Sequence, residues 1–170
     1  MSTILTAEHV CNPPPMKKWK ALVDPIFINH DITVVDYYGN EREAEIVLSN
    51  PGYDLCLLRV VGVWAPAVPL ADSTVSIGEK VYNVASPAGF FAPGMVPLLE
   101  GRYSGDMSWY GEYDSVYTIP VRGGSSGSGV LNSRGELIGI IHSAIYNFPN
   151  VGLACTYEEL NDFLTTYKTL

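Results

Sequence analysis

The chain alternates short apolar runs with turn-forming residues along most of its length. Runs rich in Val, Ile, Leu and Tyr between Gly, Pro, Asn and Asp predict β-strands. We expect two groups of strands, the first near residues 3–8, 32–38, 42–48 and 54–61, and the second near 80–85, 99–107, 115–121, 129–132, 137–144 and 151–155. Only the tail has helical spacing, with apolar Leu160, Phe163 and Leu164 and with Thr156 as a possible N-cap. The pattern predicts an all-β protein that ends in a helix.

Composition and charge narrow the class of protein. A chain of 170 residues with 16 Gly and 12 Pro suits one β-rich domain with tight turns, which buries roughly 70% of the surface of the unfolded chain. The net charge of −8 argues against nucleic acid as a partner, because nucleic-acid binding requires a basic face. No apolar run reaches membrane-spanning length, and no signal-peptide pattern is visible.

The loop 123–129 contains glycines on both sides of a hydroxyl. A serine that attacks a carbonyl needs backbone N–H groups aimed at the oxygen that becomes negative, and glycine allows the close approach. In a Gly-x-Ser-Gly frame, Ser126 is the candidate nucleophile, and the N–H groups of Gly124 and Ser126 are candidate oxyanion donors. The alternative is a flexible linker, although strand-like sequence lies on both sides. The nucleophile elbow of α/β-hydrolases is excluded, because residue 128 is a serine.

A nucleophilic serine needs a general base and a group that orients the base. His9 lies in the β-prone run 4–11, at the mouth of a strand and before the rigid segment 12–15, which suits a general base; the alternative is an exposed N-terminal histidine. Asp54 opens the apolar run 54–60. A carboxylate there is costly unless it is hydrogen-bonded, and a histidine N–H would serve. The alternative for Asp54 is an ordinary turn aspartate.

These blocks resemble the catalytic segments of chymotrypsin-fold serine proteases, in the order His, Asp, Ser. The matching segments are 6–10, 54–58 and 124–129. Further segments are similar to the trypsin-like domain of the HtrA type: 69–73, 77–81, 86–89, 135–140 and 150–154. The resemblance covers nearly the whole chain and implies a double β-barrel of the chymotrypsin type with a C-terminal helix. It implies a single peptidase domain over 1–170, divided into an N-terminal barrel (1–65), a connection (66–78), a C-terminal barrel (79–156) and the helix (157–170).

The chain departs from this family in two places. Family members carry two further strands before the base, whereas only eight residues precede His9. Three alternatives follow: the sequence begins late, the first barrel is incomplete and lacks its first strands, or another segment completes it. An unclosed barrel would expose strand edges. Ser125 stands where trypsin-like zymogens have an aspartate that pairs with a newly cut N-terminus. Activation by that ion pair is not expected.

Three cysteines, Cys11, Cys56 and Cys155, are scattered without metal-ligand spacing. We expect them to be buried, reduced thiols, which do not support an extracellular disulfide framework. No metal and no organic cofactor is implied.

The resemblance implies a serine endopeptidase that hydrolyses peptide or protein substrates through an acyl-enzyme. Ser126 would attack, His9 would shuttle the proton, and Asp54 would orient the imidazole. The alternatives are a catalytically silent peptide-binding or assembly module on the same fold, and a viral or phage processing protease. The cellular location and the oligomeric state stay open.

The family places residues 138–144 along the pocket for the residue before the scissile bond, so Ile141, His142, Ser143 and Ala144 are candidate substrate-binding residues. Glutamyl endopeptidases have a Gly-x-His pattern there, and this chain is one residue longer. A shift of one residue flips the face of a strand. With a bulge, His142 would enter the pocket and favour Glu or Gln; without one, Ile141 would favour an apolar residue. A structural role for His142 is the third option.

Overall fold

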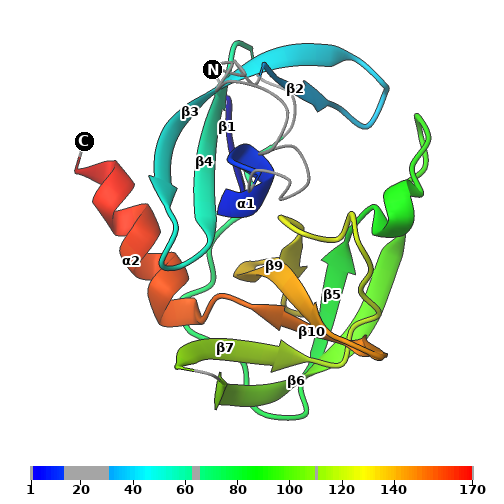
Figure 1. Cartoon of the computed structure of the whole chain (residues 1–170), viewed down its shortest axis with the longest axis vertical. Helices are drawn as coiled ribbons and strands as arrows, with labels where there is room; N and C mark the ends of the chain where they lie inside the picture. The colour runs from blue at the N-terminus through cyan, green and yellow to red at the C-terminus, as the bar shows by residue number, and fades with distance from the viewer. Residues whose placement is uncertain (1, 14–30, 63–65, 110, 170) are drawn as a thin grey trace, which may run out of the picture.

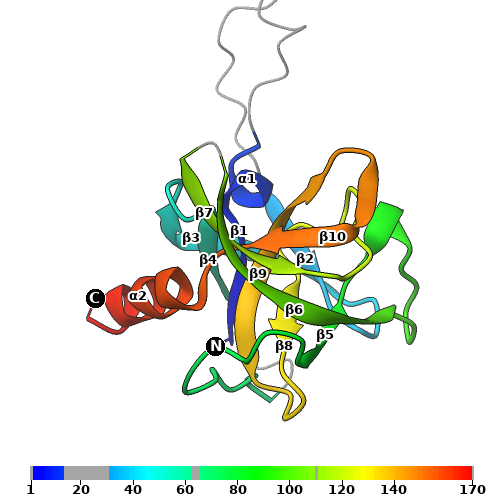
Figure 2. The same cartoon turned by 90° about the horizontal axis from the view of Figure 1, so that it is seen from below.

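The computed structural model describes residues 2–13, 31–62, 66–109 and 111–169. Each of the ten expected strands is present, and Figures 1 and 2 together label them. The elements are β1 (Ser2–Ala7), α1 (Glu8–Cys11), β2 (Ile32–Val35), β3 (Glu41–Asn50), β4 (Leu55–Val60), β5 (Lys80–Val84), the 3-10 turn η1 (Pro87–Gly89), β6 (Leu98–Trp109), β7 (Glu112–Tyr117), β8 (Gly129–Leu131), β9 (Leu137–Ile145), β10 (Phe148–Ala154) and α2 (Tyr157–Lys168).

The strands form an open sheet and a closed barrel. The open sheet has the order β1-β4-β3-β2, and all of its pairs are antiparallel. Its central strand β4 is buried at every position except Arg59, as its continuous apolar run predicts. The second sheet closes in the order β10-β7-β6-β5-β8-β9. This is the expected double-barrel fold, with a half-barrel in place of a closed first barrel within the described residues.

The helix α2 joins the two sheets. It packs beside β3 and β4 after the chain leaves the closed barrel (Figures 1 and 2). Its buried residues Leu160 and Phe163 share one apolar cluster with Leu55 and Leu57 of β4 and Ile140 of β9. The helix begins with a capping box. Thr156 Oγ1 accepts a hydrogen bond from the Glu159 N–H, and the Glu159 carboxylate accepts one from the Thr156 N–H. The expected helix and its cap are confirmed.

One expectation about the first sheet is wrong. The chain turns into α1 after Ala7, so His9 lies just beyond the end of β1. The turn is held by the Glu8 N–H, which donates to the Asp54 carbonyl at 3.0 Å. It also carries Cys11 back toward β4, where Cys11 and Cys56 form a disulfide with their Cα atoms 6.6 Å apart. These two cysteines are therefore not reduced thiols.

The third cysteine matches the expectation. Cys155 is free and buried in the cluster under α2. Burial raises the pKa of its thiol to about 12, because removal of water disfavours the thiolate.

Neither helix of the described chain has the length and apolarity to cross a membrane.

Candidate active site

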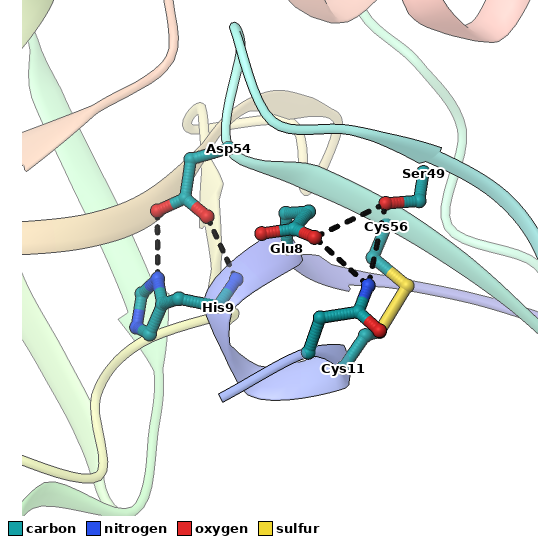
Figure 3. Close-up of a disulfide and its surroundings, with 7 residues drawn as sticks. Glu8, His9, Cys11, Ser49, Asp54 and Cys56 are labelled. Atoms are coloured by element: carbon teal, nitrogen blue, oxygen red, sulfur yellow. Dashed lines mark hydrogen bonds and ion pairs between the residues drawn. A yellow bond between two sulfur atoms is a disulfide. The ribbon is translucent and has the colours of Figure 1, made fainter. Parts of the chain in front are cut away.

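His9 and Asp54 lie side by side where β1 ends and β4 begins, and α1 there faces the turn between β3 and β4 (Figure 3). His9 Nδ1 lies 2.7 Å from Asp54 Oδ2, and the His9 backbone N–H donates to Oδ1 at 2.9 Å. A carboxylate can only accept, so in the neutral tautomer that fits this contact the imidazole proton is on Nδ1 and the lone pair is on Nε2. The side chain of His9 is 38% exposed and that of Asp54 is 28% exposed, so the imidazole is accessible to a hydroxyl or a substrate.

Asp54 has an unusual backbone. Its φ of 49° lies in the left-handed region, which a non-glycine residue rarely adopts and which aspartate tolerates better than most. In this conformation its carbonyl oxygen and both carboxylate oxygens accept hydrogen bonds from Glu8 and His9. The aspartate thereby joins the turn before β4 to the start of α1.

The loop with Ser126 packs directly on the strand that leads to His9. A Cβ added at Gly127 would overlap the Thr6 side chain and lie 3.1 Å from the Ala7 nitrogen. Gly127 also has a φ of +84°, which favours glycine. Glycine at this position therefore brings the candidate nucleophile from the closed barrel against the end of β1, two residues before the candidate base.

The hydroxyl of Ser126 is bonded elsewhere in the substrate-free protein. It donates to the His142 carbonyl oxygen at 3.2 Å. Among the described residues it makes no hydrogen bond with His9. Such bonds are often long or absent before substrate binds, and a rotation about χ1 redirects the hydroxyl.

Two backbone amides of the loop are available to a ligand. The N–H groups of Gly124 and Ser126 have no hydrogen-bond partner in the part of the chain that the structure describes. The Gly123 carbonyl accepts from the Ala88 N–H at 2.6 Å. Since C=O and N–H point in opposite directions in a trans peptide, the Gly124 N–H points away from Ala88. A Cβ at Gly124 would lie 2.5 Å from the Ser86 oxygen, so this approach also requires glycine.

The other serines of the loop have structural partners. Ser125 is buried, and its Oγ accepts from the Arg122 N–H at 3.2 Å. Ser128 Oγ donates to the Ser125 carbonyl at 2.6 Å and accepts from Asn83 Nδ2 at 2.9 Å. These two hydroxyls stabilise the loop, whereas the hydroxyl of Ser126 contacts a single carbonyl.

A cavity of about 180 Å³ lies beside Ser126. Its lining residues are Val121, Arg122, Gly123, Ser125, Ser126, Ile141, Ser143 and Ala144. Three of the four expected substrate-binding residues therefore line it, and His142 does not.

The strand β9 contains the bulge on which the two pocket hypotheses differ. Its pairing with β10 steps from Ser143 opposite Leu153 to Ile141 opposite Ala154, so His142 is the extra residue. A bulged residue lies outside the regular alternation of faces. The bulge is present, yet Ile141 and Ser143 line the cavity and His142 does not.

The imidazole of His142 binds a carboxylate of the protein. Its Nε2 lies 3.0 Å from Asp114 Oδ1, and the two side chains are 14% and 8% exposed. The sequence analysis did not identify Asp114, although a carboxylate inside a barrel strand requires a polar partner. It also did not identify the Ala88 N–H that holds the Gly123 carbonyl, which no local pattern marks.

Comparison with known proteins identifies the family. The chain matches the family model described as trypsin-like peptidase domain over residues 2–140. A "Probable periplasmic serine endoprotease DegP-like" of Pseudomonas putida is 31% identical over 105 residues, which are 59% of this chain and 21% of that protein. The chain thus spans about a fifth of the length of this relative.

Two solved structures share the fold. The HtrA-type protease AlgW with decapeptide has a TM-score of 0.76 at 22% identity, and the match covers 98% of this chain and 49% of that chain. A serine endoprotease from Yersinia pestis has a TM-score of 0.73 at 22% identity over 96% of this chain and 53% of that chain. The chain belongs to the family of trypsin-like peptidase domains.

Proposed function

We propose that this domain is a serine endopeptidase that works through an acyl-enzyme. Ser126 is the nucleophile, His9 the general base and Asp54 the group that orients the imidazole. The observation that carries the proposal is the contact between His9 Nδ1 and Asp54 Oδ2 at 2.7 Å, at the edge of the sheet on which the Ser126 loop packs. The N–H groups of Gly124 and Ser126, which have no partner among the described residues, support it.

The reaction follows from these groups. The Ser126 hydroxyl leaves the His142 carbonyl, gives its proton to His9 Nε2 and attacks the substrate carbonyl carbon. The negative oxygen receives hydrogen bonds from the Gly124 and Ser126 N–H groups. The imidazolium, stabilised by Asp54, then protonates the leaving amine as the C–N bond breaks. Water attacks the resulting ester with His9 as base and releases the acid.

We further propose that the cavity beside Ser126 accepts a small apolar side chain. Ile141 and Ala144 contribute apolar surface, and Asp114 binds the imidazole that would otherwise be available to an acidic substrate. A peptide-library cleavage profile tests this preference in the parent and in His142→Gln, which keeps a donor for Asp114. An aliphatic preference that survives the substitution supports the apolar pocket. A preference for Glu or Gln that disappears in His142→Gln contradicts it.

Substitution of the three groups tests the mechanism. Ser126→Ala should fold normally and lose on the order of a million-fold in turnover. Asp54→Asn should lose on the order of ten-thousand-fold, because the imidazole is then held in the wrong tautomer. Ser128→Ala is the matched control and should retain most activity. If Ser128→Ala is inactive and Ser126→Ala is active, the proposed nucleophile is wrong and Ser128 takes that role.

The rival function is a silent peptide-binding module. One observation favours it, namely that the Ser126 hydroxyl contacts the His142 carbonyl and not His9. A phosphonate probe separates the two functions, because it forms a covalent bond only with an activated serine. Stoichiometric labelling that is lost in both Ser126→Ala and His9→Ala supports the peptidase. An unlabelled protein that still binds peptides supports the silent module.

A further inference from the structure

The Cys11–Cys56 disulfide connects the same two segments as the His9–Asp54 pair (Figure 3). Cys11 follows His9 by two residues on α1, and Cys56 follows Asp54 by two residues at the start of β4. Both cysteines are buried, at 3% and 0% exposure. The candidate base and its orienting carboxylate therefore lie beside a covalent link.

The helix α1 cannot hold this position by itself. It has four residues and no side-chain N-cap, and its closing bond runs from the Asn12 N–H to the Glu8 carbonyl at 2.8 Å. Helices far shorter than about 12 residues do not persist alone in water. The location of His9 therefore depends on what ties α1 to β3 and β4.

The polar ties are few and partly exposed. Glu8 Oε1 accepts from Asn12 Nδ2 at 2.8 Å and from Ser49 Oγ at 3.3 Å. The hydrogen bond between His9 and Asp54 is itself partly exposed. Water competes for such groups, so these bonds open and close readily. Among the described contacts that hold α1 on the sheet, the disulfide is covalent and buried, so water cannot replace it.

We propose that Cys11 and Cys56 are positioning residues whose disulfide keeps His9 aligned with Asp54, so that reduction of the disulfide lowers turnover. A dithiol reductant attacks one sulfur, becomes oxidised to its own disulfide, and leaves two protein thiols. The C-terminal end of α1 is then free to move from β4. This inference rests on the proposed function only where hydrolysis is the readout.

Cys155 provides the matched control. It lies in the apolar cluster under α2, whereas the disulfide lies in a separate cluster with Leu58. Replacement of Cys155 by Ala removes a thiol of similar burial without loosening α1. The working background is therefore Cys155→Ala, compared with the same protein carrying Cys11→Ala and Cys56→Val, which preserves apolar contact without the link.

The experiment measures turnover and the state of the imidazole in oxidised, dithiothreitol-reduced and re-oxidised protein. We expect reduction to lower kcat by about tenfold to a hundredfold with little change in KM, as a misplaced catalytic group does. Re-oxidation should restore kcat, and the doubly substituted protein should be slow and indifferent to dithiothreitol. The low-field proton resonance of His9 Nδ1–H, identified by its absence in Asp54→Asn, should broaden on reduction.

The outcomes separate the inference from the proposed function. Full turnover and an unchanged Nδ1–H resonance after reduction would overturn the positioning role. Loss of the resonance in a protein that hydrolyses nothing when oxidised would support positioning and refute the peptidase. Global unfolding on reduction, seen as loss of near-ultraviolet circular dichroism, would overturn the inference, because the link would then stabilise the whole sheet and not His9 in particular.

Discussion

Replacement of Gly127 by Ala should damage the candidate site through two separable effects. The first is backbone strain, because Gly127 has a φ of +84° and an alanine in the left-handed region costs roughly 1–2 kcal/mol. The second is steric overlap, since the new Cβ meets the Thr6 side chain and lies 3.1 Å from the Ala7 nitrogen. Overpacking of this kind costs roughly 1–3 kcal/mol.

The sum is a loss of about 2–5 kcal/mol in the free energy of unfolding. A matched control separates the two effects. Gly135 has a φ of +77°, with nothing within 4 Å of an added Cβ. Gly135→Ala should therefore lose only the strain component, about 1–2 kcal/mol, and should keep its hydrolytic activity.

Denaturant unfolding and peptide hydrolysis provide the assays. The overlap displaces the Ser126 loop from the end of β1, so Gly127→Ala should also lower kcat/KM by about a hundredfold. Adding Thr6→Ala should recover part of both losses, as expected for two residues in contact. The reasoning fails if Gly127→Ala is no less stable than Gly135→Ala, or if Thr6→Ala recovers nothing.

Three further predictions concern the fold and its cysteines. Ellman's reagent should detect no thiol in the folded, unreduced protein, because Cys155 is buried and burial raises the pKa of its thiol to about 12. It should detect one thiol in the unfolded protein and three in the protein that is both unfolded and reduced. Reduction should lower the free energy of unfolding by about 4 kcal/mol by chain entropy, since the cysteines are 45 residues apart, and an unchanged urea midpoint would contradict this. In the same urea assay, Phe163→Ala should lower the free energy of unfolding by about 3–5 kcal/mol, and Thr156→Ala should lower it by about 1 kcal/mol through loss of the helix cap. Equal losses would show that Phe163 does not anchor α2.

The sequence alone determined the strands, the last helix and the candidate catalytic residues. The apolar run of β4 and the spacing of Leu160 and Phe163 are local patterns, and burial of one face follows from them directly. The glycines around Ser126 are a local pattern too, because the positive φ of Gly124 and Gly127 favours glycine. Thr156 was recognisable as a cap because an N-cap residue just before a helical pattern is also a local signal.

The tertiary structure decided which distant residues meet. The turn into α1 depends on Asp54 accepting bonds from Glu8 and His9, and the disulfide depends on that turn. The bulge at His142 and its bond to Asp114 depend on how β7, β9 and β10 close the barrel. Propensity and periodicity report on neighbours along the chain, whereas these contacts result from strand register and packing summed over both sheets. For that reason the disulfide and the orientation of His142 became visible only in the folded molecule.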